Sequence, residues 1–461
     1  MGIYSTLNIG RDAIITSQRA IELTGHNIAN VNTPGYSRQR LILQANAPID
    51  IGVGQMGSGV DVNGIERIYD IFLGDQINSA AQDLGKWEAQ RNSLERVESI
   101  FDESSGFGLN NAMSAYWASW QDLANNPNLP AARQIVVGEG ENLTNTFNTI
   151  YSDLAGVQSD LDASISVAVD KINEMATQLD DLNRKIVLSE ASGNSANDLR
   201  DRRDQLMKEL SELIDFTSTE ASDGSITVTL GDGNNLVDAS GASTLFATDT
   251  DGDSFLDIAW SDPSGSNINA NISGGNIKGW LEARDVIING YLTSLDTLAT
   301  TIRDQVNAVH SAGRAPDNSQ NNFFVPAGTL VAGTFAVNPD LVSDSNLVAA
   351  GDTSDSGDNR TAIDIAGLQH DTFSIAGNTQ TFDNYYGMLV SNVGIDVRNS
   401  SQNYDYQSSV AFQLDNYRES ISGVSLDEEM VNLIKFQHAY DAAAKLISTV
   451  DEMLDTLISM V

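Results

Sequence analysis

The sequence predicts a mainly α-helical protein with inserted β structure, in which long N- and C-terminal coiled-coil helices flank a helical shaft domain and an outward β-rich domain. Three observations predict this fold class. An apolar residue recurs every three or four positions through residues 433–461, and every seven positions through residues 7–28. Between residues 226 and 230 the apolar period falls to two, as in a β-strand. A chain of 461 residues is long enough for about two to four domains.

The C-terminal stretch has the apolar spacing of a coiled-coil seam. The seam positions are Leu433, Phe436, Tyr440, Ala443, Ile447, Val450, Leu454, Leu457 and Val461. Neither Gly nor Pro follows Gly423, so one helix is expected to continue for about 40 Å. A single helix cannot bury its own seam, and each large apolar side chain left in water forgoes about 1.5–3 kcal/mol. This helix therefore needs a partner.

The N-terminal stretch offers that partner. Large residues recur every seven positions, at Leu7, Ile14, Ile21 and Ile28. Offset by three from them are mostly small residues that would let another backbone approach closely, namely Gly10, Ser17, Thr24 and Val31. A turn at residues 32–35 ends the helix, because the residue before a proline avoids the helical region. We expect the two terminal helices to pair, although the same spacing also suits two ordinary core helices of a bundle.

The chain between the ends alternates helical and extended patterns. Residues 39–69 contain short apolar stretches interrupted by Pro48 and by glycines, which indicates strands. Helical periodicity returns near residue 69 and continues to 100, and a Gly-containing break at residues 104–108 precedes the next helix. Residues 221–224 form the turn of a predicted hairpin before residues 226–230. The predicted units are a terminal coiled-coil or polymerisation region (1–38 plus 426–461), a helical shaft with short β segments (39–215, 277–312 and 386–425), a β-hairpin-rich insertion (216–276) and a β/loop-rich outer region (313–385).

Composition excludes several function classes. The net charge is −38, from 25 Lys+Arg against 63 Asp+Glu, whereas phosphate backbones and anionic membranes require a basic surface. There is no cysteine, so disulfides, a thiolate nucleophile and a thiolate zinc site are excluded. No apolar run approaches the roughly 20 residues of a membrane helix, and no cleavable signal peptide is apparent.

The sequence contains little that indicates catalysis. Residues 249–257 carry carboxylates at alternate positions, which suits a hard cation such as Ca²⁺, but Ser254 and Trp260 stand where an EF-hand loop has Gly and Glu. A solvated turn between two strands explains the same residues. The four histidines lack the spacing of a zinc pair, and no nucleophile elbow or phosphate loop is present. Trp117 and Trp120 are expected in the core. We therefore expect no enzyme activity, no cofactor and no metal site.

Three segments resemble one known family. Residues 26–39 read HNIANVNTPGYSRQ, and this stretch resembles the N-terminal signature of bacterial flagellar rod, hook and hook-associated proteins. Its last four residues are similar to the hook-associated protein 1 branch of that family, as are residues 422–430, which read SGVSLDEEM. Residues 197–206, NDLRDRRDQL, are similar to a further segment of that branch. The resemblance is close over roughly the first hundred and last fifty residues.

The resemblance implies a structural, non-enzymatic role in flagellum assembly and motility, as an adaptor at the hook–filament junction. The implied partners are the hook protein, the second junction protein, further copies in a ring and an export chaperone on the C-terminal helix. The protein would be secreted by flagellar type III export, without a cleaved signal peptide, to the extracellular flagellum. The expected assembly residues are Leu7, Ile14, Ile21, Ile28, Asn30, Asn32, Pro34, Gly35, Tyr36, Leu433, Phe436, Tyr440, Ile447, Val450, Leu454 and Leu457. The alternatives are another axial protein, of the hook or distal rod, and an extracellular calcium- or ligand-binding stalk protein.

Overall fold

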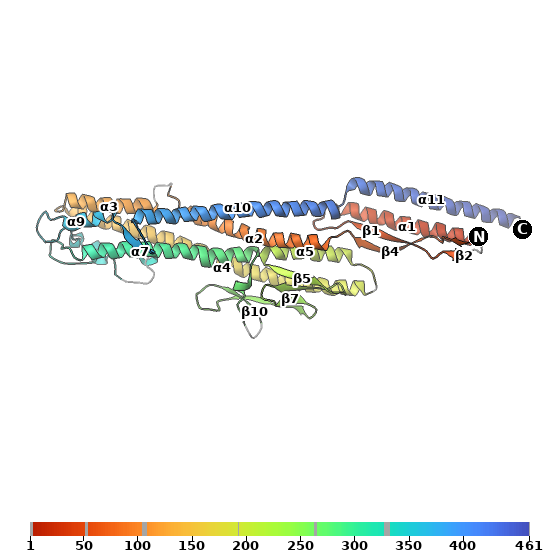
Figure 1. The fold of residues 1–461 in the computed structure, drawn as a ribbon, viewed down its shortest axis with the longest axis horizontal. Coiled ribbons are helices and arrows are strands. Elements are labelled where there is room, and N and C mark those ends of the chain that lie inside the picture. The colour runs from red at the N-terminus through yellow and green to blue at the C-terminus, as the bar shows by residue number, and fades with distance from the viewer. Residues whose placement is uncertain are drawn as a thin grey trace.

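The computed structural model of the chain describes residues 3–50, 54–103, 108–191, 193–261, 265–326 and 332–460. The molecule is elongated, and both termini lie at the same end (Figure 1). The α-helices are α1 (Ile3–Ala29), α2 (Ile71–Ile100), α3 (Leu109–Asn125), α4 (Pro130–Glu190), α5 (Asn197–Leu213), α6 (Gly275–Leu281), α7 (Asn289–His310), α8 (Pro339–Ser343), α9 (Arg360–Gly367), α10 (Phe382–Ser422) and α11 (Leu426–Ser459). The strands are β1 (Gln39–Ala45), β2 (Ile49–Asp50), β3 (Gln55–Met56), β4 (Val60–Arg67), β5 (Phe216–Glu220), β6 (Ile226–Leu230), β7 (Asn235–Asp238), β8 (Gly241–Ala242), β9 (Leu245–Thr248), β10 (Asp257–Trp260), β11 (Phe373–Ile375) and β12 (Asn378–Gln380).

The shaft is a bundle organised on α4, which has 61 residues and is about 90 Å long. Pro130 starts this helix at a position where its missing N–H costs no hydrogen bond. The apolar positions that the sequence spacing predicts are buried along α4, at Leu143, Phe147, Ile150, Leu154, Val157 and Leu161. Trp117 and Trp120 of α3 are fully buried in the same core, as predicted. The mainly helical fold class is confirmed.

A second core joins the other half of α4 to α5 and a small sheet. The sheet is antiparallel with strand order β5-β6-β7-β8, and β9 pairs separately with β10. Ile226, Val228 and Leu230 of β6 point into this core, so the alternation in the sequence is the alternation in the structure. Gly224 supplies the positive φ (85°) of the predicted hairpin turn. The strands lie on one side of the shaft (Figure 1).

Two segments differ from the sequence pattern. In the region at 313–385, predicted as β/loop-rich, the strands are β11 and β12, and the described residues before 358 contribute to β structure only the isolated bridges Arg314↔Gly351 and Phe324↔Val337. Their apolar residues are clustered aromatics rather than alternating positions, and Phe323 and Phe324 are buried in the shaft core. The segment at residues 277–312, predicted as part of the helical shaft, contains a π-helical segment, Glu282–Ile288. The predicted break at 104–108 lies outside the described residues except for Gly108.

A two-stranded ribbon connects α1 to the shaft. β1 pairs antiparallel with β4, with a bulge between Ile42 and Leu43, and β2 pairs with β3. The ribbon runs beside α1 toward the end that carries both termini (Figure 1). None of the described helices is both long enough and apolar enough to cross a membrane.

Candidate assembly interface

The two terminal helices lie side by side, α1 against α11, beyond the end of the shaft (Figure 1). The buried face of α1 consists of small or polar residues, which are Gly10, Thr16, Ser17, Ala20, Thr24 and Asn27. A Cβ atom added to Gly10 would lie 2.9 Å from Cγ1 of Ile447, so the absence of a side chain permits this approach. On α11 the buried residues are Glu429, Ala443 and Val450. The pairing within one chain therefore uses the small side of the N-terminal repeat.

The large residues of both repeats remain accessible to different degrees. Half-buried positions are Leu7, Ile14, Ile21, Ile28, Leu433, Phe436, Ile447 and Leu454, whereas Tyr440 and Leu457 are exposed. Further exposed apolar residues of α11 lie outside the predicted seam, at Met430, Val431, Ile434, Leu446, Met453 and Ile458, and exposed Met460 follows the helix. Val461 lies outside the described residues. Contiguous exposed apolar surface on a soluble protein marks an interaction surface.

A polar cluster joins the terminal pair to the shaft, and its centre is Asn27. This side chain is 2% exposed. Its amide donates to the backbone oxygen of Gln39 (2.9 Å) and to Oε2 of Glu429 (3.2 Å), while its oxygen accepts from the Tyr36 hydroxyl (2.7 Å) and the Gln39 amide (3.1 Å). All four hydrogen-bonding positions of the amide are used. Asn27 thus holds α1, β1 and α11 together.

The turn after α1 fixes the path of the chain toward the shaft. Asn30 closes it by donating to the carbonyl of His26 (3.0 Å) and accepting from the hydroxyl of Thr33 (3.1 Å). Gly35 has φ +78°, and a Cβ there would lie 3.0 Å from Oε1 of Gln205 on α5. Asn32 and Pro34 are exposed. The signature turn therefore requires glycine both for its backbone angle and for its contact with the shaft.

The carboxylates of α5 accept hydrogen bonds from the residues that follow this turn. The amide of Ser37 donates to Oδ2 of Asp201 (2.9 Å), and Nε2 of Gln39 donates to Oδ1 of Asp198 (2.7 Å). Arg67, at the end of β4, pairs with Asp201 (2.9 Å) and Asp204 (2.6 Å). Three aspartates on one short helix thus bind the signature turn and the end of the ribbon.

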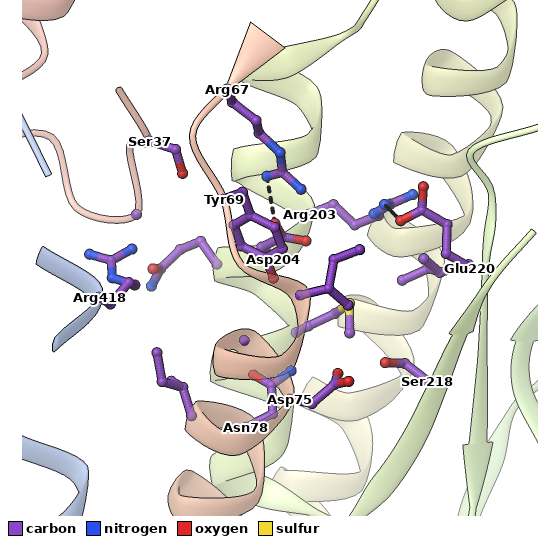
Figure 2. Close-up of a pocket in the computed structure, with 17 residues that line it drawn as sticks. Ser37, Arg67, Tyr69, Asp75, Asn78, Arg203, Asp204, Ser218, Glu220 and Arg418 are labelled. Carbon is purple, nitrogen blue, oxygen red and sulfur yellow. Dashed lines mark hydrogen bonds and ion pairs between the residues drawn. The ribbon is translucent and has the colours of Figure 1, made fainter. Parts of the chain in front are cut away.

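A small cavity of about 110 Å³ lies behind Arg67 (Figure 2). The Arg67 guanidinium lies 4.1 Å from the centre of the Tyr69 ring, a cation–π contact. Burial raises the pKa of Asp204, although neighbouring Arg67 opposes the shift. Burial, and then the carboxylates around it, also raise the pKa of Tyr36, so its hydroxyl stays protonated and keeps donating to Asn27. We call this network of Asn27, Tyr36, Gln39, Arg67 and the α5 aspartates the joint. Its side chains bind one another, so their role is to hold the structure together.

The joint also fixes the start of α11. The amide of Arg38 donates to the carbonyl of Ser422 (2.8 Å), and its guanidinium pairs with Glu428. Gly423 separates α10 from α11, and a Cβ there would lie 2.3 Å from the carbonyl oxygen of Glu419. The segments at residues 26–39, 197–206 and 422–430, far apart in sequence, therefore meet in one place. Asn27, Gln39, Arg67 and Glu429 were not among the predicted interface residues.

The acidic loop that suits calcium is placed apart from this joint. Carboxylate oxygens of Asp249, Asp251 and Asp253 lie within 4.8 Å of one another, and all three residues are exposed. Asp249 accepts the backbone amides of Gly252 (2.7 Å) and Ser254 (3.2 Å), as in a solvated turn.

Three protein-family models match this chain, one over part of the shaft and one at each end of the chain. The family model described as the flagellar hook-associated protein FlgK helical domain matches residues 94–324. The models for the flagella basal body rod protein and for the flagellar basal body rod FlgEFG protein C-terminal match residues 7–36 and 418–460, respectively. The terminal pair and the shaft therefore match different family models.

Curated relatives match this chain over almost its whole length. Flagellar hook-associated protein 1 of Bacillus subtilis (strain 168) is 29% identical, with 99% of this chain and 98% of the relative covered. The protein of the same name from Escherichia coli (strain K12) is 27% identical over 99% of this chain and 100% of the relative. The solved structure of the flagellar hook junction protein FlgK from Burkholderia pseudomallei has a TM-score of 0.68 at 14% identity, covering 76% of this chain and all of that one, and shares the fold.

Proposed function

The chain belongs to the FlgK family of flagellar hook-associated proteins, and we propose that it acts as the adaptor between hook and filament by polymerising through its terminal helix pair. It is a component of the flagellum. The single observation that carries the mechanism is the mismatch within the pair. The face that α1 buries in the pair is made of small and polar residues, whereas large apolar residues stay exposed on α11.

The exposed residues form a stripe along one side of α11. Leu446 and Met453 are seven residues apart and Leu457 follows four residues later, so the three lie on one flank of the helix. Burial of each such side chain in an interface would contribute about 1.5–3 kcal/mol. We infer that neighbouring copies of this chain cover the stripe in the assembled ring. The half-buried N-terminal residues Leu7, Ile14, Ile21 and Ile28 would contribute the opposing surface.

The polar joint gives this assembly a defined geometry. A ring closes only if each terminal pair leaves its shaft in one direction. Asn27, Tyr36 and Arg67 connect three chain segments through buried, directional hydrogen bonds. Buried polar networks of this kind specify one arrangement rather than several. The signature turn, with Asn30, Asn32, Pro34 and Gly35, would therefore orient subunits while the apolar stripe binds them.

The neighbours follow from membership of the family. The hook protein would lie on one side of the ring and the second junction protein on the other. An export chaperone would cover the exposed stripe of α11 before secretion through the flagellar type III route, without cleavage of a signal peptide. The β-rich side of the shaft would face outward in the extracellular flagellum.

Electron microscopy of cells lacking the gene, with an assay of filament protein in the medium, tests this function. Bare hooks and released filament protein are the expected result, and the wild-type chain should restore filaments. Leu457→Ser, which changes an exposed residue of α11 (51% exposed), should not restore them. The matched variant Leu188→Ser changes an exposed leucine of the shaft (76% exposed) and should restore them fully. Normal filaments in the deletion strain would refute the proposed role.

A further inference from the structure

Among the residues that the structure describes, four arginine side chains are almost completely buried, and three of them have carboxylate partners. Arg67 pairs with Asp201 and Asp204, Arg203 with Glu220 (3.2 Å), and Arg284 with Asp162 (2.6 Å). The fourth is Arg133, in the first turn of α4, which is 6% exposed. Unlike the other three, Arg133 is not paired with a carboxylate of the described residues.

Arg133 has no carboxylate within 4.0 Å among the residues that the structure describes. Its Nε donates to the backbone oxygen of Val348 (3.2 Å), and its terminal nitrogens have no hydrogen-bond partner in the described part of the chain. Burial lowers the pKa of Arg133, and no nearby carboxylate offsets this effect. Arginine nevertheless remains charged in proteins. The terminal nitrogens are not among the buried atoms of the described residues that lack a hydrogen-bond partner, so they are accessible from the cavity that Arg133 lines. An accessible guanidinium without a counter-charge is suited to binding an anion.

Arg133 faces a cavity large enough for that partner. The cavity has a volume of about 340 Å³ and lies between the start of α4 and the loop that precedes α9, at the end of the molecule opposite both termini (Figure 1). Arg314 also lines it, and its guanidinium contacts only the oxygens of Asn318 among the described residues. Pro130, the first residue of α4, forms part of the wall, and the N-terminus of a long helix favours negative charge.

Two carboxylates also line the cavity but do not neutralise these arginines. Asp358 accepts the amide (2.8 Å) and hydroxyl (2.9 Å) of Thr353, and the amide of Arg360 (3.3 Å). Asp355 is exposed and does not lie within 4.0 Å of either guanidinium. Asp358 therefore forms its hydrogen bonds within the loop, and Asp355 faces solvent. The positive groups retain unused hydrogen-bond donors.

We propose that this cavity binds an oxyanion, held by the guanidinium of Arg133 with support from Arg314 and the N-terminus of α4. The planar fork of arginine matches the two oxygens of a carboxylate or a phosphate. Such a group has two sources, a free phosphate ion or a carboxylate of the kind that an acidic side chain carries. The site is independent of the terminal pair, and its function would be to complete the distal end of the shaft.

Calorimetric titration of the full chain with inorganic phosphate, and separately with acetate, tests the proposal at constant ionic strength set by sodium chloride. The wild-type chain should bind at least one of the two anions, and the stronger of them identifies the chemistry of the natural occupant. Arg133→Met should weaken that binding at least about tenfold, the loss expected for a charge-assisted hydrogen bond. Arg314→Met should weaken it less. Arg360→Met, which changes an exposed arginine of α9 that is paired with Asp352, should bind as the wild-type chain does.

Thermal unfolding provides a second readout that does not depend on heats of binding. Phosphate stabilises proteins generally, so the test is the difference between variants. The anion that binds should raise the Tm of the wild-type chain more than that of Arg133→Met. In sodium chloride alone, Arg133→Met should be at least as stable as the wild-type chain, because it removes an uncompensated charge. Equal titrations and equal Tm shifts in the two chains, or no binding of either anion, would overturn the proposal.

Discussion

The shaft and the terminal pair are built from similar amphipathic helices, but they bury opposite kinds of residue. In the shaft, α4 buries Leu143, Phe147 and Leu154 completely, in a core that it shares with the aromatic residues of α3. In the terminal pair, α1 buries Gly10 and Ser17, while large apolar residues of α11 remain exposed. The shaft therefore completes its core within one chain, whereas the pair presents an unfinished surface. The completeness of the core therefore distinguishes the shaft, which needs no other chain, from the terminal pair, which we expect to assemble with neighbouring copies.

The largest effect on stability should come from the shaft core. Trp120→Ala removes a fully buried ring and should cost about 3–5 kcal/mol of unfolding free energy, because the core cannot close over the space left behind. Urea unfolding measures the change. Leu188→Ala, on the exposed side of α4, should stay within about 0.5 kcal/mol. Similar losses in the two variants would mean that the shaft core does not determine stability.

A pH change should also act on the shaft rather than on the pair. His310 is fully buried, its Nδ1–H donates to the carbonyl of Asn321 (2.6 Å), and its Nε2 accepts the amide of Ala349 (3.0 Å). Burial lowers its pKa to about 4, against 6.5 when unfolded. The unfolded chain therefore binds a proton in this window that the folded chain rejects. Lowering the pH from 7 to 4 should remove about 3 kcal/mol of stability through this residue.

The variant His310→Gln keeps a donor and an acceptor but does not titrate. Carboxylates contribute equally to both chains, so the difference between their pH profiles isolates His310. The profile of the variant should be flatter between pH 6.5 and about 4. Parallel profiles would show that His310 is not held neutral.

Asn27→Ala should loosen the joint without unfolding the shaft. It removes the partners of the buried backbone groups of Gln39, and one partner each from Tyr36 and Glu429, at a cost of about 1–3 kcal/mol. Hydrogen exchange should accelerate in residues 27–39 and in the first turns of α11. Asn32→Ala is the matched control, because Asn32 is an exposed residue of the same signature. Unchanged exchange in Asn27→Ala would contradict the role of the cluster.

A smaller and more local effect is expected at Gly10. Gly10→Val places a side chain against Ile447 and should weaken the pairing of α1 with α11 by about 1–3 kcal/mol, as overpacking does. Faster hydrogen exchange confined to the terminal helices would report it. Gly25→Val is the control on the same helix, since a Cβ at Gly25 meets no atom within 4 Å. If the two variants exchange alike, the helices are not in the close contact described.

The sequence predicted those structural features in which apolar residues recur at a regular spacing. The buried positions of α4 and the alternation in β6 follow from spacing alone, because one face of each element is buried. The seam of α11 stays a prediction, since only Ala443 and Val450 of its described positions are buried in the single chain. The small residues Gly10, Ser17 and Thr24 of α1, which the spacing marks as the side where another backbone can approach closely, are the ones buried in the pair. The partners of Arg67 could not be predicted, because ion pairs between distant segments leave no periodic signal. Arg133, near the start of a helix, resembles a surface residue until its burial is seen.

Hydrogen exchange of the full chain, free and within isolated hook–filament structures, tests the central claim most directly. The claim is that the shaft is complete alone and the terminal pair is completed by neighbouring copies. Amides of α1 and α11 should exchange at least about tenfold more slowly after assembly, the factor that burial of one apolar side chain provides, while shaft amides stay unchanged. Terminal helices that are already as protected as α4 in the free chain would contradict the account.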